Sequence, residues 1–284
     1  MSNNLDQING GSIELRQFIE KRQEQKAWFE LNGYYNGNLD TNGEYRLVTA
    51  LAKRCALFVD IGYNEGVVSK KFQHFNPDIK IVGFEPNPAM PTNPSDHQIV
   101  RLALSDVSNT KAKFFVHPDH SGVSSLNERT QLNPSYRKNF VSFEVLLERL
   151  DDVYKGLIPS SHSGDVFLKI DVEGSEAKVF RGAETFFKEK RPVGYFEYSE
   201  GWKESGELLQ NLFYKFDAID YRLYRVTPLG LEHIRFFHHS MENYIYQNIF
   251  FAPKDYLDTF WKPITIAWDF SQTLFYEFAA QNPV

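Results

Sequence analysis

The chain has 284 residues, 42% of them hydrophobic, which is enough to bury one sizeable core in a single α/β domain with additions. A formal net charge of −6 without long Lys/Arg runs makes nucleic acid a poor candidate partner, and the single Cys55 excludes an internal disulfide framework. No stretch approaches the ~18 uninterrupted apolar residues of a membrane-spanning helix. The polar residues 1–11 resemble neither a signal peptide nor a transit peptide, so we expect a soluble, cytoplasmic protein that contacts neither nucleic acid nor a membrane.

The first 43 residues are predicted to form a helical extension and a linker. Ser12 can cap a helix that runs to about residue 32, and the turn-rich segment 32–43 separates it from a second helix at 44–54. The core domain then covers residues 44–253. Residues 254–284 are rich in aromatic side chains and are expected to pack on this domain or on a partner subunit, so a homodimer through the terminal extensions is conceivable.

Apolar strands alternate with helices from residue 55 onward, which favours a Rossmann-like α/β fold with a mostly parallel sheet and helices on both faces. The expected strands are Ala56–Val59, Ile81–Phe84, Ile99–Leu104, Val166–Ile170 and Val193–Tyr198, and the expected helices are Val67–Phe75, Val145–Leu150, Glu176–Phe187 and Leu208–Phe213. Lys111–His117 alternates in polarity, as a half-exposed inserted strand would. Ala218–Val226 and Tyr244–Ala252 are expected to close the sheet as an antiparallel pair.

The segment that joins the first strand to the following helix predicts a nucleoside-binding corner. Asp60 ends the apolar strand, and Gly62 and Gly66 punctuate the turn, where glycine permits positive φ and close approach of a ligand to the backbone. A dinucleotide fingerprint requires glycine at position 64, where the pyrophosphate meets the backbone, but this chain has Asn64. The D-x-G-x-x-x-G spacing is instead typical of sites for S-adenosylmethionine, whose ammonium group suits an acid at the strand end.

Further carboxylates follow the next strands, so they are expected along the same edge of the sheet. Glu85 ends the second strand, where a carboxylate can accept hydrogen bonds from both ribose hydroxyls. Asp106 follows the third strand and could accept from the adenine amino group or form an Asx turn. Asp171 and Glu173 follow the fourth strand, and this position in an open α/β sheet predicts the reaction centre.

A general base is the least constrained part of the predicted site. Asp171 is the first candidate from its location, and His117 and His120 are further candidates because they precede the polar loop 121–126. The residues expected to line the acceptor pocket are Ser124, Ser125, Glu173 and Glu197. No spacing among the acids compels a metal site, so no metal ion is predicted.

Several short blocks of the chain resemble the FkbM family of S-adenosylmethionine-dependent methyltransferases. These blocks are Phe58–Gly66, Val82–Pro88, Leu104–Asp106 and Leu168–Glu176 with Phe180–Ala183, of which K-I-D-V-E-G-x-E is the most distinctive. The resemblance covers roughly residues 56–253, and it departs at Tyr63, where the family commonly has alanine, and at Glu65, where it has a hydrophobic residue.

The resemblance implies a seven-stranded Rossmann-like sheet and in-line methyl transfer to a hydroxyl of a small molecule, such as a sugar or a secondary metabolite. The implied cofactor is S-adenosyl-L-methionine, with S-adenosyl-L-homocysteine as its product. The predicted cofactor-binding residues are Asp60, Gly62, Tyr63, Asn64, Gly66, Glu85, Pro86, Ser105, Asp106 and Asp171.

Two alternatives from other classes stay open at this point. An NAD(P)-dependent oxidoreductase or epimerase could use a related Rossmann sheet, although Asn64 and Asp60 argue against it. A non-catalytic scaffold with a degenerate cofactor site would keep the fold and use the terminal extensions for contacts. Among methyltransferases, an amine or a protein side chain also stays open as the methyl acceptor.

Overall fold

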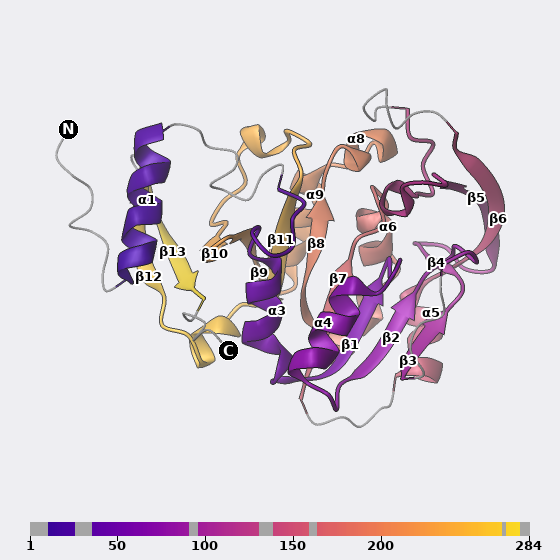
Figure 1. The fold of residues 1–284 in the computed structure, drawn as a ribbon, viewed down its shortest axis with the longest axis horizontal. Helices are drawn as coiled ribbons and strands as arrows, with labels where there is room; N and C mark the ends of the chain where they lie inside the picture. The colour runs from indigo at the N-terminus through magenta and orange to yellow at the C-terminus, as the bar shows by residue number, and fades with distance from the viewer. Residues whose placement is uncertain are drawn as a thin grey trace.

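A computed structural model describes residues 11–25, 36–90, 96–130, 139–158, 164–268 and 271–278 of the chain. These residues form a large central sheet with helices on both faces and a small second sheet beside it (Figure 1). The large sheet has ten strands in the order β12-β13-β10-β9-β11-β8-β7-β1-β2-β3. The small sheet has the order β4-β6-β5.

One half of the large sheet is parallel, as the alternation of strands and helices predicts. Its strands, in spatial order, are β3 (His97–Val100), β2 (Lys80–Phe84), β1 (Cys55–Ile61), β7 (Asp165–Ile170) and β8 (Val193–Tyr198). The strands β1, β7 and β8 are buried on both faces, which explains their nearly continuous apolar sequences. The carboxyl ends of the parallel strands meet at one edge, where the loops after β1, β2 and β7 come together.

The other half of the sheet is antiparallel. Its strands, in spatial order, are β11 (Gln247–Pro253), β9 (Tyr221–Thr227), β10 (Gly230–His233), β13 (Ser271–Glu277) and β12 (Ile264–Trp268). The pairing of β9 with β11 confirms the predicted antiparallel pair, but that pair does not end the sheet. Because β10 folds back on β9 and the C-terminal segment adds the β12–β13 hairpin, the sheet is wider and more mixed than the mostly parallel seven-stranded sheet we expected.

Helices cover both faces of the large sheet (Figure 1). One face carries α3 (Glu44–Ala52) and α4 (Val67–Phe75), and the other carries α5 (Leu150–Leu157), α6 (Glu176–Arg181), α7 (Glu184–Lys190), α8 (Gly201–Ser205) and α9 (Leu209–Ala218). Three short 3-10 turns are η2 (Ser121–Val123), η3 (His239–Met241) and η4 (Leu257–Thr259). No helix in the described part of the chain is long and apolar enough to cross a membrane.

The N-terminal helix α1 (Ile13–Gln25) packs against the C-terminal hairpin. Leu15 is fully buried in a cluster with Leu229, Ile264 and Phe275, and the Leu15 amide donates to Ser12 Oγ at 3.0 Å, which confirms the predicted cap. The remainder of the predicted helix and the start of the predicted linker lie outside the described residues. Both ends of the described chain therefore stabilise the antiparallel half of the sheet.

The small sheet contains β4 (Ala103–Leu104), β5 (Thr110–Val116) and β6 (Val141–Glu148). β5 confirms the predicted inserted strand. The helix expected at 145–150 was wrong for residues 145–148, which belong to β6 and pair with β5 and β4, and helix α5 begins only at Leu150. The strand expected at 99–104 divides between the two sheets. The helix expected at 176–187 breaks at Gly182, where an added Cβ would lie 1.9 Å from the Ser105 carbonyl oxygen.

Candidate cofactor and active site

The turn after β1 forms one wall of the candidate site. Gly62 and Gly66 have φ values of 84° and 66°, and the Gly62 and Tyr63 amides both donate to the Phe84 carbonyl at 3.0 Å. A Cβ at Gly62 would lie 1.7 Å from the Asp171 carbonyl oxygen, and one at Gly66 would lie 2.2 Å from the Tyr63 ring. The Cβ positions of both glycines are therefore occupied by the protein itself, so a side chain would not fit at either position, and Gly62 is among the residues that line the pocket.

Tyr63 lies beneath this turn and is 3% exposed. Its hydroxyl lies 2.7 Å from His97 Nδ1, and His97 Nε2 lies 3.1 Å from Gln73 Oε1. With the Gln73 oxygen as acceptor, the histidine proton is on Nε2, so Nδ1 accepts from the tyrosine. The ring also lies against Gly83 of β2. Tyr63 thus supports the turn from below and is not among the residues that line the pocket.

Lys169 connects the carboxylates that follow β1 and β7. Its ammonium lies 3.4 Å from Asp60 Oδ1, 3.1 Å from Asp171 Oδ2 and 3.3 Å from the Gly62 carbonyl. Burial raises the pKa of Asp60, while Lys169 and the 2.6 Å hydrogen bond from Ser69 oppose that rise. Burial alone would lower the pKa of Lys169, but the Asp171 and Asp60 carboxylates leave it raised. Asp60 therefore lies below the pocket as the partner of Lys169, whereas Asp171 lines the pocket.

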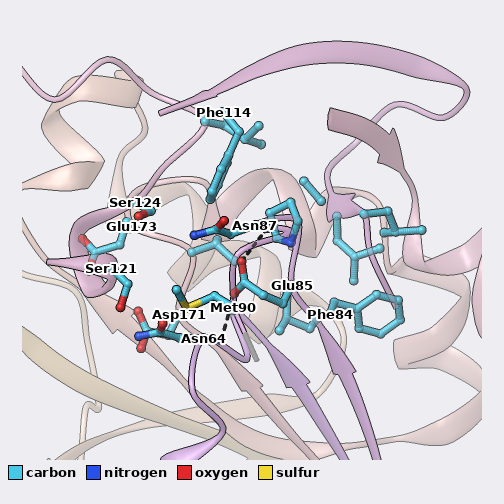
Figure 2. Close-up of a pocket in the computed structure, with 18 of the residues that line it drawn as sticks. Asn64, Phe84, Glu85, Asn87, Met90, Phe114, Ser121, Ser124, Asp171 and Glu173 are labelled. Carbon is cyan, nitrogen blue, oxygen red and sulfur yellow. Dashed lines mark hydrogen bonds between the residues drawn. The ribbon is translucent and has the colours of Figure 1, made fainter. Parts of the chain in front are cut away.

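The pocket itself lies at the carboxyl edge of the parallel strands and has two chemically different ends. The end marked by Phe84 is apolar, and the apolar lining also includes Ile61, Pro86, Leu102, Ala103 and Leu104, whereas Met90 reaches the polar side chains (Figure 2). The other end is polar, and its side chains are Asn64, Ser121, Ser124, Asp171 and Glu173. Figure 2 shows these polar side chains grouped on the left, with Phe84 on the opposite side and the Phe114 ring pointing into the pocket from above.

Glu85 lies between the two ends (Figure 2) and is held by the backbone. Its Oε2 accepts from the Asn64 amide and its Oε1 from the Asn87 amide, both at 2.8 Å. Burial raises the pKa of Glu85, and these two hydrogen bonds oppose the rise. Each carboxylate oxygen keeps a second acceptor direction, so the fixed carboxylate can still accept from a pair of ligand hydroxyls.

Glu173 is held by Ser125 of the predicted polar loop and by Arg129, which the sequence did not single out. Arg129 Nη2 lies 3.0 Å from Glu173 Oε2, while Arg129 Nη1 and Ser125 Oγ donate to the Glu173 carbonyl at 3.1 and 2.7 Å. The Glu173 backbone has a φ of 57°, and burial raises the pKa of its carboxyl group to about 8. Ser125 thus fixes the backbone of Glu173. Of the two serines predicted to line the acceptor pocket, Ser124 lines it and Ser125 does not.

Asp171, Glu173 and Glu197 form a three-carboxylate cluster in which one oxygen from each lies within 4.8 Å of the others. Glu197 is 8% exposed, and burial raises its pKa well above the usual value. Two members of the cluster already pair with the cations of Lys169 and Arg129. The structure thus brings together three acids, although their spacing in the sequence did not require them to meet.

The remaining predicted residues lie near the pocket but outside the set that lines it. His117 is 4% exposed, and its ring centroid lies 4.9 Å from that of His120, just before η2. Asp106 pairs with Arg181 at 2.9 Å; burial alone would raise the pKa of Asp106, but Arg181 lowers it. Ser105 is buried, and its amide donates to a β6 carbonyl.

Comparison with known proteins identifies the family. The family model described as the methyltransferase FkbM domain matches residues 60–226, which is more than half of the chain. The chain belongs to the FkbM methyltransferase family. This match confirms the resemblance seen in the sequence, and with it S-adenosylmethionine as the cofactor of this FkbM methyltransferase.

Two solved structures are similar to this FkbM methyltransferase at low identity. The methyltransferase FkbM from Methylobacillus flagellatus KT is 15% identical with a TM-score of 0.38, and the alignment covers 72% of this chain and 47% of that one. The O-methyltransferase TomG from Streptomyces achromogenes, involved in tomaymycin synthesis and solved in complex with SAM, is 12% identical with a TM-score of 0.36 over 74% of this chain and 79% of that one. The chain thus spans about half the length of the first structure. No curated protein matches the chain.

The residues present fit S-adenosylmethionine. Asn64 Oδ1 is buried and has no hydrogen-bond partner within the described ranges, although it belongs to a residue that lines the pocket. A buried carbonyl oxygen without a donor indicates a ligand that supplies one, as the ammonium group of the cofactor would. Glu85 provides a fixed acceptor for the ribose hydroxyls, and the apolar end of the pocket provides walls for a heteroaromatic base.

Proposed function

We propose that this FkbM methyltransferase transfers a methyl group to a hydroxyl of a small molecule, such as a sugar or a secondary metabolite. The observation that carries the proposal is the two-ended pocket, in which an apolar half and a half lined by hydroxyl and carboxylate groups meet at Glu85. The apolar half suits the adenine of the cofactor. The polar half suits an acceptor that bears hydroxyl groups, because each such group can exchange hydrogen bonds with serine and carboxylate oxygens.

When bound, S-adenosylmethionine supplies an electrophilic methyl group on its sulfonium sulfur. We assign binding of the ribose hydroxyls to Glu85 and of the ammonium group to Asn64 Oδ1, since both are acceptors held in place by the turn after β1. Asp171 would orient the acceptor hydroxyl, because its carboxylate lines the pocket and is fixed by Lys169 at 3.1 Å. Such alignment of two reactants supplies several kcal/mol, up to ~7–11 in the best intramolecular cases.

We assign to Glu173 the role of the base that accepts the proton of the acceptor hydroxyl. Its carboxyl group lines the polar end, and a pKa of about 8 matches a base that works near neutral pH. His117 and His120, which we also considered from the sequence, lie outside the set of lining residues. A positioned base contributes roughly 10² to 10⁴ in rate, so Glu173→Gln should lower kcat by about this factor while the affinity for S-adenosylhomocysteine is retained.

Calorimetry with S-adenosylmethionine, S-adenosylhomocysteine and NAD tests the cofactor site directly. We expect both adenosyl ligands to bind, and Glu85→Gln to weaken them by about tenfold or more, since hydrogen bonds to a charged group contribute about 1.5–3 kcal/mol. Glu144→Gln is the matched control, because Glu144 is exposed on β6 outside the pocket. Binding of NAD alone would favour an oxidoreductase, and binding of none of the three would favour a scaffold with a degenerate site.

A further inference from the structure

The ionisable groups that line the pocket are of one chemical kind. Among the described residues that line it, the ionisable side chains are Glu85, Asp171 and Glu173, and no lysine, arginine or histidine accompanies them. Glu197 adds a fourth carboxyl group behind this surface as part of the three-carboxylate cluster. Within the described ranges, an acceptor in the polar end therefore faces carboxyl groups, and no cationic side chain lines the pocket beside them.

The cations that pair with Asp171 and Glu173 are already engaged by the protein. Lys169 is 7% exposed in its side chain and lies between Asp60 and Asp171, so its single positive charge is shared by two carboxylates. Arg129 is 2% exposed and pairs with both Glu173 and Glu204. Neither cation can turn toward an anionic acceptor without leaving a buried carboxylate without its partner, which is costly.

The polar end also contains an unused hydroxyl. Ser124 Oγ is buried and has no hydrogen-bond partner in the described part of the chain, although Ser124 lines the pocket. The Phe114 ring, 7% exposed, points into the same space (Figure 2). A hydroxyl can donate or accept, and an aromatic face packs against the apolar face of a ring. These two groups fit a ligand with both a ring face and neutral polar substituents.

We propose that the methyl acceptor of this site is a hydroxylated ring compound that is neutral or positively charged, that it hydrogen-bonds to Ser124 Oγ, and that acceptors bearing a phosphate or carboxylate group are rejected. This inference rests on the proposed function, since it describes the acceptor half of the same pocket. The physical reason is that an anion placed beside Asp171 and Glu173 loses its hydration without gaining an opposite charge.

The test uses four related probes on the full chain loaded with S-adenosylhomocysteine. The probes are methyl glucoside, glucosamine, glucuronate and glucose 6-phosphate, and ligand-detected NMR titration measures the affinity of each. We expect the neutral and cationic probes to bind at least about tenfold more tightly than the two anions, which corresponds to about 1.4 kcal/mol in the free energy of binding. Equal or tighter binding of either anion overturns the proposal, and so does the absence of binding by all four probes.

Two pairs of variants separate local charge and hydrogen bonding from general effects. Asp171→Asn should narrow the difference in affinity between the neutral and the anionic probes several-fold. Asp78→Asn, the same change at an exposed position, should leave that difference in affinity unchanged. Ser124→Ala should weaken the neutral probes about threefold to tenfold, as expected for one hydrogen bond, while Ser142→Ala on the exposed face of β6 should have no effect. Unchanged discrimination in Asp171→Asn, or unchanged affinity in Ser124→Ala, contradicts the assignment.

The same samples distinguish this inference from the proposed function. Binding of S-adenosylhomocysteine is measured before any probe is added. If that ligand fails to bind, the proposed function fails and the inference fails with it. If it binds and the anionic probes are preferred, only the acceptor assignment is overturned.

Discussion

Replacement of Lys169 tests how strongly the candidate site depends on one buried cation. In Lys169→Met, the carboxylates of Asp60 and Asp171 lose the ammonium that lies 3.4 and 3.1 Å from them, and Asp60 is 1% exposed. Removal of one partner from a buried ion pair costs about 3–5 kcal/mol. Because a domain is stable by only ~5–15 kcal/mol, we expect a large loss in the free energy of unfolding.

Asp60 is the second position of a double-mutant cycle with Lys169. Asp60→Asn removes the buried charge that Lys169→Met leaves behind, and it keeps a side-chain oxygen that can accept from Ser69. The double variant should therefore be more stable than Lys169→Met alone, with a coupling energy of about 1–3 kcal/mol. Asp60→Asn thus also recovers protein for measurement if Lys169→Met by itself is too unstable to purify.

Urea denaturation followed by tryptophan fluorescence provides the free energies for all four members of the cycle. Lys113→Met, at an exposed position of β5, is the matched control and should change stability by no more than about 0.5 kcal/mol. A loss below about 1 kcal/mol in Lys169→Met, or strictly additive effects of the two substitutions, would refute the role we give to this cation.

Three further predictions concern packing, pH and metal ions. A Cβ at Gly83 would lie 2.5 Å from the Tyr63 ring, so Gly83→Ala should destabilise by about 1–3 kcal/mol, and Tyr63→Ala in the same chain should remove most of this cost in thermal unfolding. Burial raises the pKa of Glu176 to about 7, so the folded state binds this proton more tightly than the unfolded state, and stability is lost as pH rises from about 4.5 through 7. Glu176→Gln should flatten that decline in urea titrations between pH 5 and 8, by about 1.4 kcal/mol for each pH unit between the unfolded and folded pKa values of this carboxyl group, and an unaltered slope would contradict this. Chelation with EDTA should leave binding of S-adenosylhomocysteine and methyl transfer unchanged, because two cations already partner the three-carboxylate cluster; loss of activity that Mg²⁺ restores would show that the cluster holds a metal ion.

Local patterns in the sequence predicted the part of the site that belongs to consecutive strand ends. Glu85 and Asp171 line one pocket because parallel strands bring their carboxyl ends to a common edge, whatever the detailed packing. The turn at Gly62 and Gly66 was also predictable, because glycine spacing after an apolar strand identifies a tight strand-to-helix connection. The contact of Gly62 with the Asp171 carbonyl was not predictable, since it depends on β1 and β7 lying side by side in the sheet.

Partners that are distant in the sequence decided the remaining roles. Asp106 has the location of an adenine ligand in the sequence, and α6 presents Arg181 to it in an ion pair that the sequence did not predict. Arg129 gave no sequence signal, because a single arginine in a polar loop is ordinary, and only the fold buries it against Glu173. The loop serines divide in the same way, since the isolated bridge between Ser125 and β5 turns one of them inward.

The sequence by itself determined the α/β class of the fold, the glycine turn after β1 and the family, because these depend on periodicity, turn chemistry and short blocks of residues that are local along the chain. Tertiary structure alone decided the width of the sheet and the conformation of residues 145–148, where pairing with β5 and β4 prevails over helical propensity. It also decided which acids face the pocket and which are paired beneath it. Burial and ion pairing depend on contacts between side chains that form only when the chain folds, and the spacing of residues along the sequence does not specify those contacts.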